Sequence, residues 1–421
     1  MILVVLVRAL VTHAAASLCV DNETTYKFLH DGIRREYILY IPKTLCRSVA
    51  HGDALPLVVA AHCFGCTAAV ELATLKDVAA ERGFIVVAPE GVAQSWNALE
   101  CCGEALARGL DDVGFIASVV EAVQHRLPFI AKHATYATGF SNGGFMVSLL
   151  ATSGASWLHG IAPLAGYVYR GYEHVRAPIP VFAFHSSDDT YVRPNGCSAW
   201  SSCTRLAEQC CCGIGADSKQ CFSVESAFDE WARINLCFGN ASSSSLRKWV
   251  PNDGFQCQAA RGCAATTALC MVGGGVHHTA WARLSGSTVG VQSLVGLFFA
   301  KLACTSSVGN VWTEEKTAPA AKARCRCASG FGGPHCLTPQ LNPAMQDRTA
   351  KDLASAAALL RTATALSAPA QVAPTLPRLA SPRLQTALLR LLAVAGVVVV
   401  AIGGALVAWR HRRRAGAAPQ R

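Results

Sequence analysis

The stretch YATGFSNGGFM, residues 136–146, places Ser141 in the pattern Gly-X-Ser-X-Gly. The residues TYAT before the pattern are typical of a strand, and the run GGFMVSLLAT after it is typical of a helix. A sharp strand–turn–helix connection with small neighbours exposes a serine hydroxyl as a nucleophile. Because a serine hydroxyl is weakly nucleophilic by itself, this interpretation requires a base and an orienting acid further along the chain.

Both partners are present downstream in the required order. FAFHSSDDTYV, residues 182–192, offers Asp188 and Asp189, and CMVGGGVHHTAW, residues 270–281, offers His277 and His278. Each pair follows a strand-like run, and α/β folds place functional side chains in the loops after strands. The order serine, acid, histidine fits the elbow motif.

An earlier segment supplies the first of the two expected oxyanion donors. VVAAHCFGCTA, residues 58–68, is the loop after an early strand, and its Phe64 amide, with Cys63 next in preference, is the first donor that we expect. The second is the amide of Asn142, directly after the nucleophile.

Residues 20–303 alternate short apolar runs with amphipathic stretches, which predicts a mostly parallel sheet with helices on both faces. Asp111 and Asp112 begin one of the amphipathic stretches and are interpreted as helix-capping residues. The expected strands cover 35–42, 56–62, 83–89, 135–140 and 179–185, and the expected helices cover 68–83, 111–127 and 225–237.

Over residues 28–300, seven segments in order resemble the secreted α/β-hydrolase esterases that include polyhydroxybutyrate depolymerases and feruloyl esterases. The resemblance implies an α/β-hydrolase fold and places Trp96, Asn97 and Trp281 beside the site as substrate-binding candidates, with core or rim aromatics as the alternative. The segments are DGIRREYILYIP, PLVVAAHCFGCTA, SWNALECCGEAL with DDVGFI, YATGFSNGGFM, HSSDDTYV, WARINLC and GGGVHHTAW.

The resemblance also orders the candidates for the triad. HSSDDTYV is similar to the family pattern H-G-x-x-D-x-x-V, which selects Asp189. GGGVHHTAW is similar to G-G-G-H-T-W-P, which favours His278, but an inserted residue before the tryptophan leaves His277 open. The implied mechanism is two-step acyl transfer on a carboxylic ester, either a feruloylated polysaccharide or a polyester, with no metal or organic cofactor.

Twenty cysteines predict an oxidising compartment and disulfides rather than a zinc site. Cys237 is expected to pair with Cys263 or Cys270, while Cys101 and Cys102 pair either with each other or elsewhere. Asn22 and Asn240 begin glycosylation sequons. The net charge of +10 comes without a basic patch interleaved with aromatics, which argues against nucleic acid as a partner.

The domain plan that we expect is that of a type I single-pass membrane protein at the cell surface or in a lumen. The apolar run 391–409 precedes RHRRR, which is typical of a membrane span with a cytoplasmic basic flank. The expected parts are a signal peptide (1–16), the catalytic domain (20–303) with a cysteine-rich insertion (197–221), a partial EGF-like segment (304–336), a flexible stalk (342–385), the span (391–409) and a basic tail (410–421).

Two other functions remain open from the sequence. An inactive hydrolase scaffold used for adhesion is suggested by the anchor, the stalk and the EGF-like cysteines. A serine peptidase shares the triad, although the esterase-like segments outside the triad favour an esterase.

Overall fold

The computed structural model divides into two compact units, residues 1–351 and 352–421, and all of the residues that it describes lie in the first unit. The described residues are 22–99, 101–168, 171–196, 223–237, 246–249, 255–273, 277, 290–306 and short pieces between 311 and 339. The expected signal peptide, cysteine-rich insertion, stalk, membrane span, basic tail and Asn240 sequon fall outside these ranges. Among the described helices, none has the length and apolar character needed to cross a bilayer.

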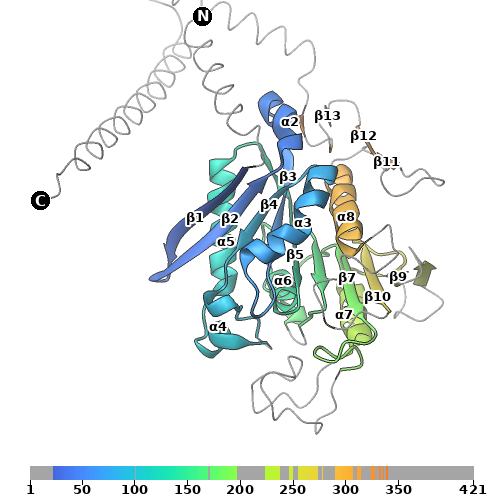
Figure 1. The fold of residues 1–421 in the computed structure, drawn as a ribbon. Helices are drawn as coiled ribbons and strands as arrows, with labels where there is room; N and C mark the ends of the chain where they lie inside the picture. The colour runs from blue at the N-terminus through green and yellow to red at the C-terminus, as the bar shows by residue number, and fades with distance from the viewer. Residues whose placement is uncertain are drawn as a thin grey trace, which may run out of the picture. The chain divides into compact units, whose positions relative to one another are not determined.

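A ten-stranded mixed sheet forms the centre of the first unit, in the order β1-β2-β4-β3-β5-β6-β7-β10-β9-β8 (Figure 1). The six strands from β4 to β10 in this order run parallel, and antiparallel strands flank them on both sides. The bounds are β1 Asn22–His30, β2 Ile33–Ile41, β3 Leu55–Ala61, β4 Ile85–Pro89, β5 Ile130–Phe140, β6 Ile161–Leu164, β7 Val181–Ser186, β8 Leu246–Trp249, β9 Phe255–Ala260 and β10 Thr267–Val272.

Helices cover both faces of the sheet, and a separate apolar core lies under each set. One core joins the sheet to α5, α6 and α7, and the other joins it to α3 and α8. This arrangement confirms the predicted mostly parallel sheet between helical layers and fits an α/β-hydrolase fold. The helices are α2 Cys46–His51, α3 Ala68–Arg82, α4 Gly103–Ala107, α5 Asp112–Arg126, α6 Asn142–Thr152, α7 Val224–Ile234 and α8 Val291–Thr305.

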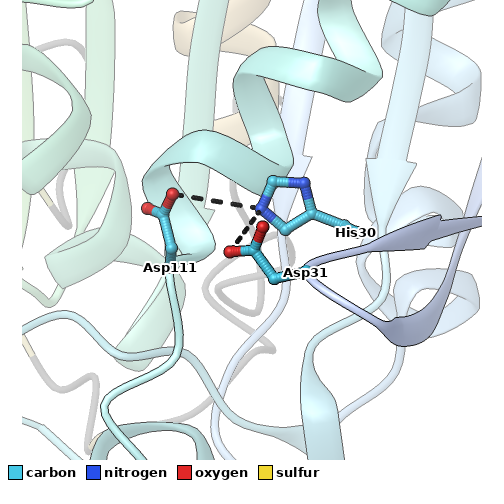
Figure 2. A group of neighbouring side chains, drawn as sticks. All are labelled: His30, Asp31 and Asp111. Atoms are coloured by element: carbon cyan, nitrogen blue, oxygen red, sulfur yellow. Dashed lines mark ion pairs between the residues drawn. The ribbon is translucent and has the colours of Figure 1, made fainter.

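The sheet begins with a hairpin that the sequence prediction did not include. Asp31 and Gly32 both have positive φ angles, 48° and 75°, as a two-residue hairpin turn requires. Beside the turn, the ring of His30 lies 3.7 Å from a carboxylate oxygen of Asp31 and 3.9 Å from one of Asp111 (Figure 2). Asp111 also accepts a hydrogen bond from the Gly114 amide and so caps α5, which confirms its predicted role.

Asp112 has a different role from the capping one that the sequence suggested. Its Oδ1 accepts a 2.6 Å hydrogen bond from Arg35, and its Oδ2 accepts one from the amide of Asn97. Both charged side chains are buried, and the Arg35 guanidinium lies over the ring of Phe115. Burial raises the pKa of Asp112, and its hydrogen bonds with Asn97 and Arg35 oppose that rise. The ion pair therefore ties the sheet, α5 and the loop around residue 97 together.

Five disulfides join described cysteines, in agreement with the disulfides predicted from the cysteine content. Cys237 pairs with Cys263, one of the two partners expected for it, and Cys101 pairs with its neighbour Cys102. The other three are Cys63–Cys66, Cys257–Cys270 and Cys304–Cys325.

The last disulfide of the series connects α8 to the segment that follows the sheet. This segment contains the short pairs β11 Val311–Thr313 with β12 Arg324–Arg326, and β13 Phe331–Gly332 with β14 Thr338–Pro339. Because α8 ends at Thr305, the predicted domain end at residue 303 falls inside this helix.

Candidate active site

Ser141 lies at the turn between β5 and α6, where the sequence motif predicts it. Its φ of 56° and ψ of −119° give the strained backbone of an elbow, and the residue is buried. Gly143 is required here, because a Cβ at that position would lie 1.9 Å from the carbonyl oxygen of Ala61. The motif is therefore explained by the close approach of α6 to the end of β3.

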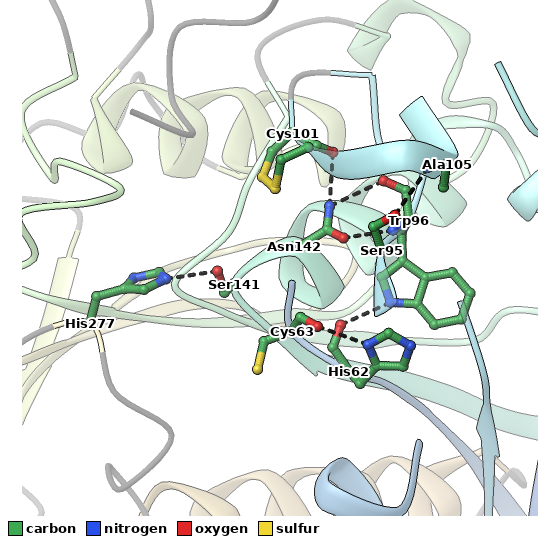
Figure 3. The surroundings of a disulfide bond; sticks show 10 residues. His62, Cys63, Ser95, Trp96, Cys101, Ala105, Ser141, Asn142 and His277 are labelled. Atoms are coloured by element: carbon green, nitrogen blue, oxygen red, sulfur yellow. Dashed lines mark hydrogen bonds between the residues drawn. A yellow bond between two sulfur atoms is a disulfide. The ribbon is translucent and has the colours of Figure 1, made fainter. Parts of the chain in front are cut away.

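The acid and the base come from the carboxyl ends of two further parallel strands, on the same sheet edge as Ser141. His277 lies between the other two side chains: its Nε2 is 2.7 Å from Ser141 Oγ and its Nδ1 is 2.7 Å from Asp189 Oδ2 (Figure 3 shows the contact with Ser141). A carboxylate accepts hydrogen bonds, so Nδ1 carries the proton and Nε2 is free to accept the serine proton. This geometry is that of a serine hydrolase triad.

Asp189 is held in place by its own loop. Its Oδ1 accepts hydrogen bonds from the amides of Tyr191 and Val192, at 2.9 and 2.8 Å, while Oδ2 faces the imidazole. Asp189 is buried, whereas Asp188 is exposed. The structure therefore brings Asp189 to the site, as the resemblance suggested, and leaves Asp188 at the surface.

The histidine assignment requires a correction. His278 was favoured from the sequence because threonine follows it, but the residue that contacts both Ser141 and Asp189 is His277. The ring of His277 also lies against two aromatic rings, Phe140 at 5.0 Å and Tyr191 at 5.3 Å between centroids. His278 lies outside the described residues. The family spacing failed here because this chain has five residues between the glycine run and Trp281, where the family pattern has two.

The loop after β3 runs beside the first turn of α6, as an oxyanion loop must. A Cβ on Gly143 would also lie 2.7 Å from the carbonyl oxygen of His62, so the two backbones meet at this point. Asn142 is the first residue of α6, and an amide at a helix start has no acceptor in a preceding turn. Cys63 and Cys66 bracket Phe64 with a disulfide. The amides of Phe64 and Asn142 remain the predicted oxyanion donors.

The predicted substrate contact through Trp96 is wrong. Its side chain is 0% exposed, and the indole Nε1 donates to the carbonyl oxygen of His62 at 2.8 Å. Asn97 is half-buried, and its side chain donates to the carbonyl oxygen of Leu110. Both side chains therefore donate to carbonyl oxygens of the protein's own backbone. Trp281 lies outside the described residues.

Two buried histidines outside the triad support its loops, and the sequence prediction gave them no role. His62 accepts the amide of Gly91 at Nε2, so its proton lies on Nδ1, 2.8 Å from the carbonyl oxygen of Cys63. His185 Nε2 donates to the carbonyl oxygen of Val192 in the loop of Asp189. Burial lowers the pKa of each to about 4. The sequence feature that could have indicated both histidines is their position at the end of an apolar, strand-like run.

These neutral histidines make the stability of the fold depend on pH. The folded state keeps His62 neutral down to about pH 4, whereas an unfolded chain protonates histidine near the ordinary value of 6.5. The unfolded state therefore binds more protons in that window, and stability falls as the pH falls from about 6.5 to about 4. The expected contribution of one histidine is up to about 1.4 kcal/mol per pH unit.

Chemical denaturation between pH 4 and 7 checks this expectation. The free energy of unfolding should depend less steeply on pH in the variant His62→Gln, by up to the contribution of one histidine. In His174→Gln, where the side chain is exposed, the dependence on pH should be that of the unmodified chain. Equal slopes in all three proteins would show that His62 is protonated alike in both states.

Comparisons with known proteins support an esterase. No family model matches the chain. Probable feruloyl esterase C of Aspergillus terreus is 29% identical over 133 residues, which cover 28% of this chain and 46% of that protein. Putative esterase NocK of Nocardia uniformis subsp. tsuyamanensis is 32% identical over 117 residues, covering 27% and 34%. The chain therefore spans less than half the length of these curated relatives.

Among solved structures, an acetyl xylan esterase from Aspergillus awamori covers 61% of this chain and 94% of its own, at 12% identity and a TM-score of 0.40. A thermostable esterase covers 42% of this chain and 49% of its own, at 20% identity and a TM-score of 0.34.

Proposed function

We propose that this protein is a serine esterase that hydrolyses carboxylic esters through an acyl-enzyme. The observation that carries the proposal is the placement of His277 within 2.7 Å of both Ser141 Oγ and Asp189 Oδ2. A serine, an imidazole and a buried carboxylate in this sequence of contacts form an activated nucleophile.

The geometry supports a two-step reaction. Ser141 Oγ forms a bond to the ester carbonyl carbon as its proton passes to His277 Nε2, and the amides of Phe64 and Asn142 stabilise the oxyanion. The same proton then passes to the leaving alcohol as the C–O bond breaks. Water next attacks the acyl carbon and gives a proton to His277 Nε2. As the bond between that carbon and Ser141 Oγ breaks, His277 returns the proton to Oγ and the acid is released.

Exposed aromatic side chains favour an ester with an aromatic or apolar group. Tyr191 is 46% exposed beside the His277 ring, and Phe64 is 50% exposed on the oxyanion loop. Exposed rings on the loop that carries Asp189 and on the oxyanion loop suit a flat apolar group, because stacked rings contribute about 0.5–1.5 kcal/mol beyond area burial. We therefore favour a feruloyl-type ester over a polyester as the substrate.

Hydrolysis of a small ester panel by the purified full-length chain tests the proposal. The panel holds p-nitrophenyl acetate, methyl ferulate and a hydroxybutyrate oligomer. We expect turnover of methyl ferulate with a KM that rises about tenfold in Tyr191→Ala, as loss of one ring contact predicts, and little change in KM for the acetate. Turnover of none of the three esters would contradict the enzyme and favour the adhesion protein on a hydrolase scaffold.

We further propose that the protein works in an oxidising compartment, held to a membrane by residues 391–409. The described disulfides and the apolar run before RHRRR support this location. In sealed vesicles whose outer face is the extracellular side, we expect added protease to digest the disulfide-bonded domain and to leave the basic tail intact.

A further inference from the structure

We propose that Trp96 is a positioning residue that sets the separation between the two oxyanion donors. This inference rests on the proposed esterase function and adds to it a residue that never touches the substrate. The donors come from different places in the chain, the loop after β3 and the first turn of α6. The separation between the two donor amides must therefore be set by other residues.

The segment 94–96 is bonded to the oxyanion loop on both sides of Phe64. The indole Nε1 of Trp96 donates to the carbonyl oxygen of His62 at 2.8 Å, and the amide of Gly65 donates to the carbonyl oxygen of Gln94 at 2.9 Å. The imidazole of His62 also lies against the indole, at 4.7 Å between ring centroids. The position of the Phe64 amide therefore follows the position of this segment.

The same segment is bonded to the second donor through the side chain of Asn142 (Figure 3). Asn142 Oδ1 accepts the amide of Trp96 at 2.7 Å, and its Nδ2 donates to the carbonyl oxygens of Trp96 at 3.2 Å and Cys101 at 2.8 Å. Asn142 is 0% exposed, so its three polar contacts are all within the protein. One residue, Trp96, thus joins the loop of the first donor to the residue that provides the second.

The surroundings leave this bridge little freedom to move. Ser95 is buried, and its Oγ donates to the carbonyl oxygen of Val92 while it accepts the amide of Ala105. A Cβ on Gly91 would lie 2.3 Å from the carbonyl oxygen of Ser95, so only glycine fits there. A rigid bridge of this kind holds donors in place before the reaction, which is the condition for strong stabilisation of a developing oxyanion.

Removing the indole N–H tests the role directly. Trp96→Phe keeps an aromatic ring against His62 and loses the hydrogen bond to the His62 carbonyl. We expect kcat for methyl ferulate to fall about 10- to 100-fold with KM changed less than about twofold, because a displaced donor weakens transition-state rather than substrate binding. Trp231→Phe is the matched control, since Trp231 is 2% exposed on α7, and it should keep kcat within about twofold.

A second readout separates positioning from loss of folded protein. Phenylboronic acid forms a tetrahedral adduct when Ser141 Oγ bonds to boron and its proton passes to His277, whereas ferulic acid binds as a planar product. The inhibition constant for the boronic acid should rise in Trp96→Phe by the same factor as kcat falls, and that for ferulic acid should stay unchanged. Replacing Trp96 by benzothienylalanine, which keeps the two-ring shape without the N–H, should reproduce both effects if the phenylalanine variant fails to fold.

The outcomes distinguish the two claims. An active unmodified chain with unchanged kcat in both Trp96 variants would overturn the positioning role and leave the esterase standing. Equal weakening of the boronic acid and ferulic acid would also overturn it, because it would show a general loss of the site. Absence of ester turnover in the unmodified chain would overturn the proposed function itself.

Discussion

Replacing His277 with alanine should lower kcat for ester hydrolysis by about 10⁶-fold, the size of effect seen when the base of a serine triad is removed. The expectation follows from the two 2.7 Å contacts of the imidazole, which make it both the acceptor of the Ser141 proton and the partner of Asp189. KM should change little, because the substrate does not need the base in order to bind. Steady-state rates with p-nitrophenyl acetate, measured to the limit of background hydrolysis, check this prediction.

His278→Ala is the matched control for this prediction. The two histidines are neighbours in the chain, so a variant at either position carries the same change in composition and local sequence. We expect His278→Ala to keep kcat within about threefold, since His277 already makes both contacts that the base of the triad requires. A large loss in His278→Ala with activity retained in His277→Ala would restore the assignment that the family spacing favoured.

Replacing Asp189 with asparagine should lower kcat by about 10⁴-fold while the fold is retained. An asparagine oxygen can still accept the amides of Tyr191 and Val192, so the loop keeps its shape. The side-chain NH₂ would then face His277 Nδ1, which favours the tautomer with its proton on Nε2 and leaves no acceptor for the serine proton. Rates at several pH values together with a thermal unfolding curve measure both halves of the prediction.

Asp188→Asn provides the comparison for Asp189→Asn. Asp188 precedes Asp189 in the chain and is exposed, so the same change of one carboxylate to an amide is made one residue away. We expect kcat to stay within about twofold. Similar losses in the two variants would mean that net negative charge near the site matters rather than the contact with His277.

Much of the sheet was predictable because its strands are short and fully apolar between turn residues. The strands β3 and β4 could be predicted from the sequence for this reason. The hairpin of β1 and β2 was missed, although the pair Asp31–Gly32 is a recognised hairpin signal. β6 spans only four residues, Ile161–Leu164, and includes a proline, so no local pattern distinguishes it from a loop.

The triad was predictable to within one residue, and the reason for the miss is physical. Chain order and motif identified the serine, and the similarity of HSSDDTYV to the family pattern selected Asp189 over Asp188. Which of two adjacent histidines reaches the serine depends on the path of the loop after β10, and sequence spacing does not describe that path. The interpretation of Trp96 failed for a related reason, because a tryptophan near an active site can face either the substrate or the protein.

The most direct test of the account is to trap the acyl-enzyme and locate the acyl group. The full-length chain is mixed rapidly with p-nitrophenyl acetate, quenched in acid, digested, and its peptides are analysed by mass spectrometry. The account predicts a burst of p-nitrophenol and an acetyl group on Ser141, with both absent in Ser141→Ala. Turnover with no acyl group on Ser141, or an equal burst in Ser141→Ala, would contradict it.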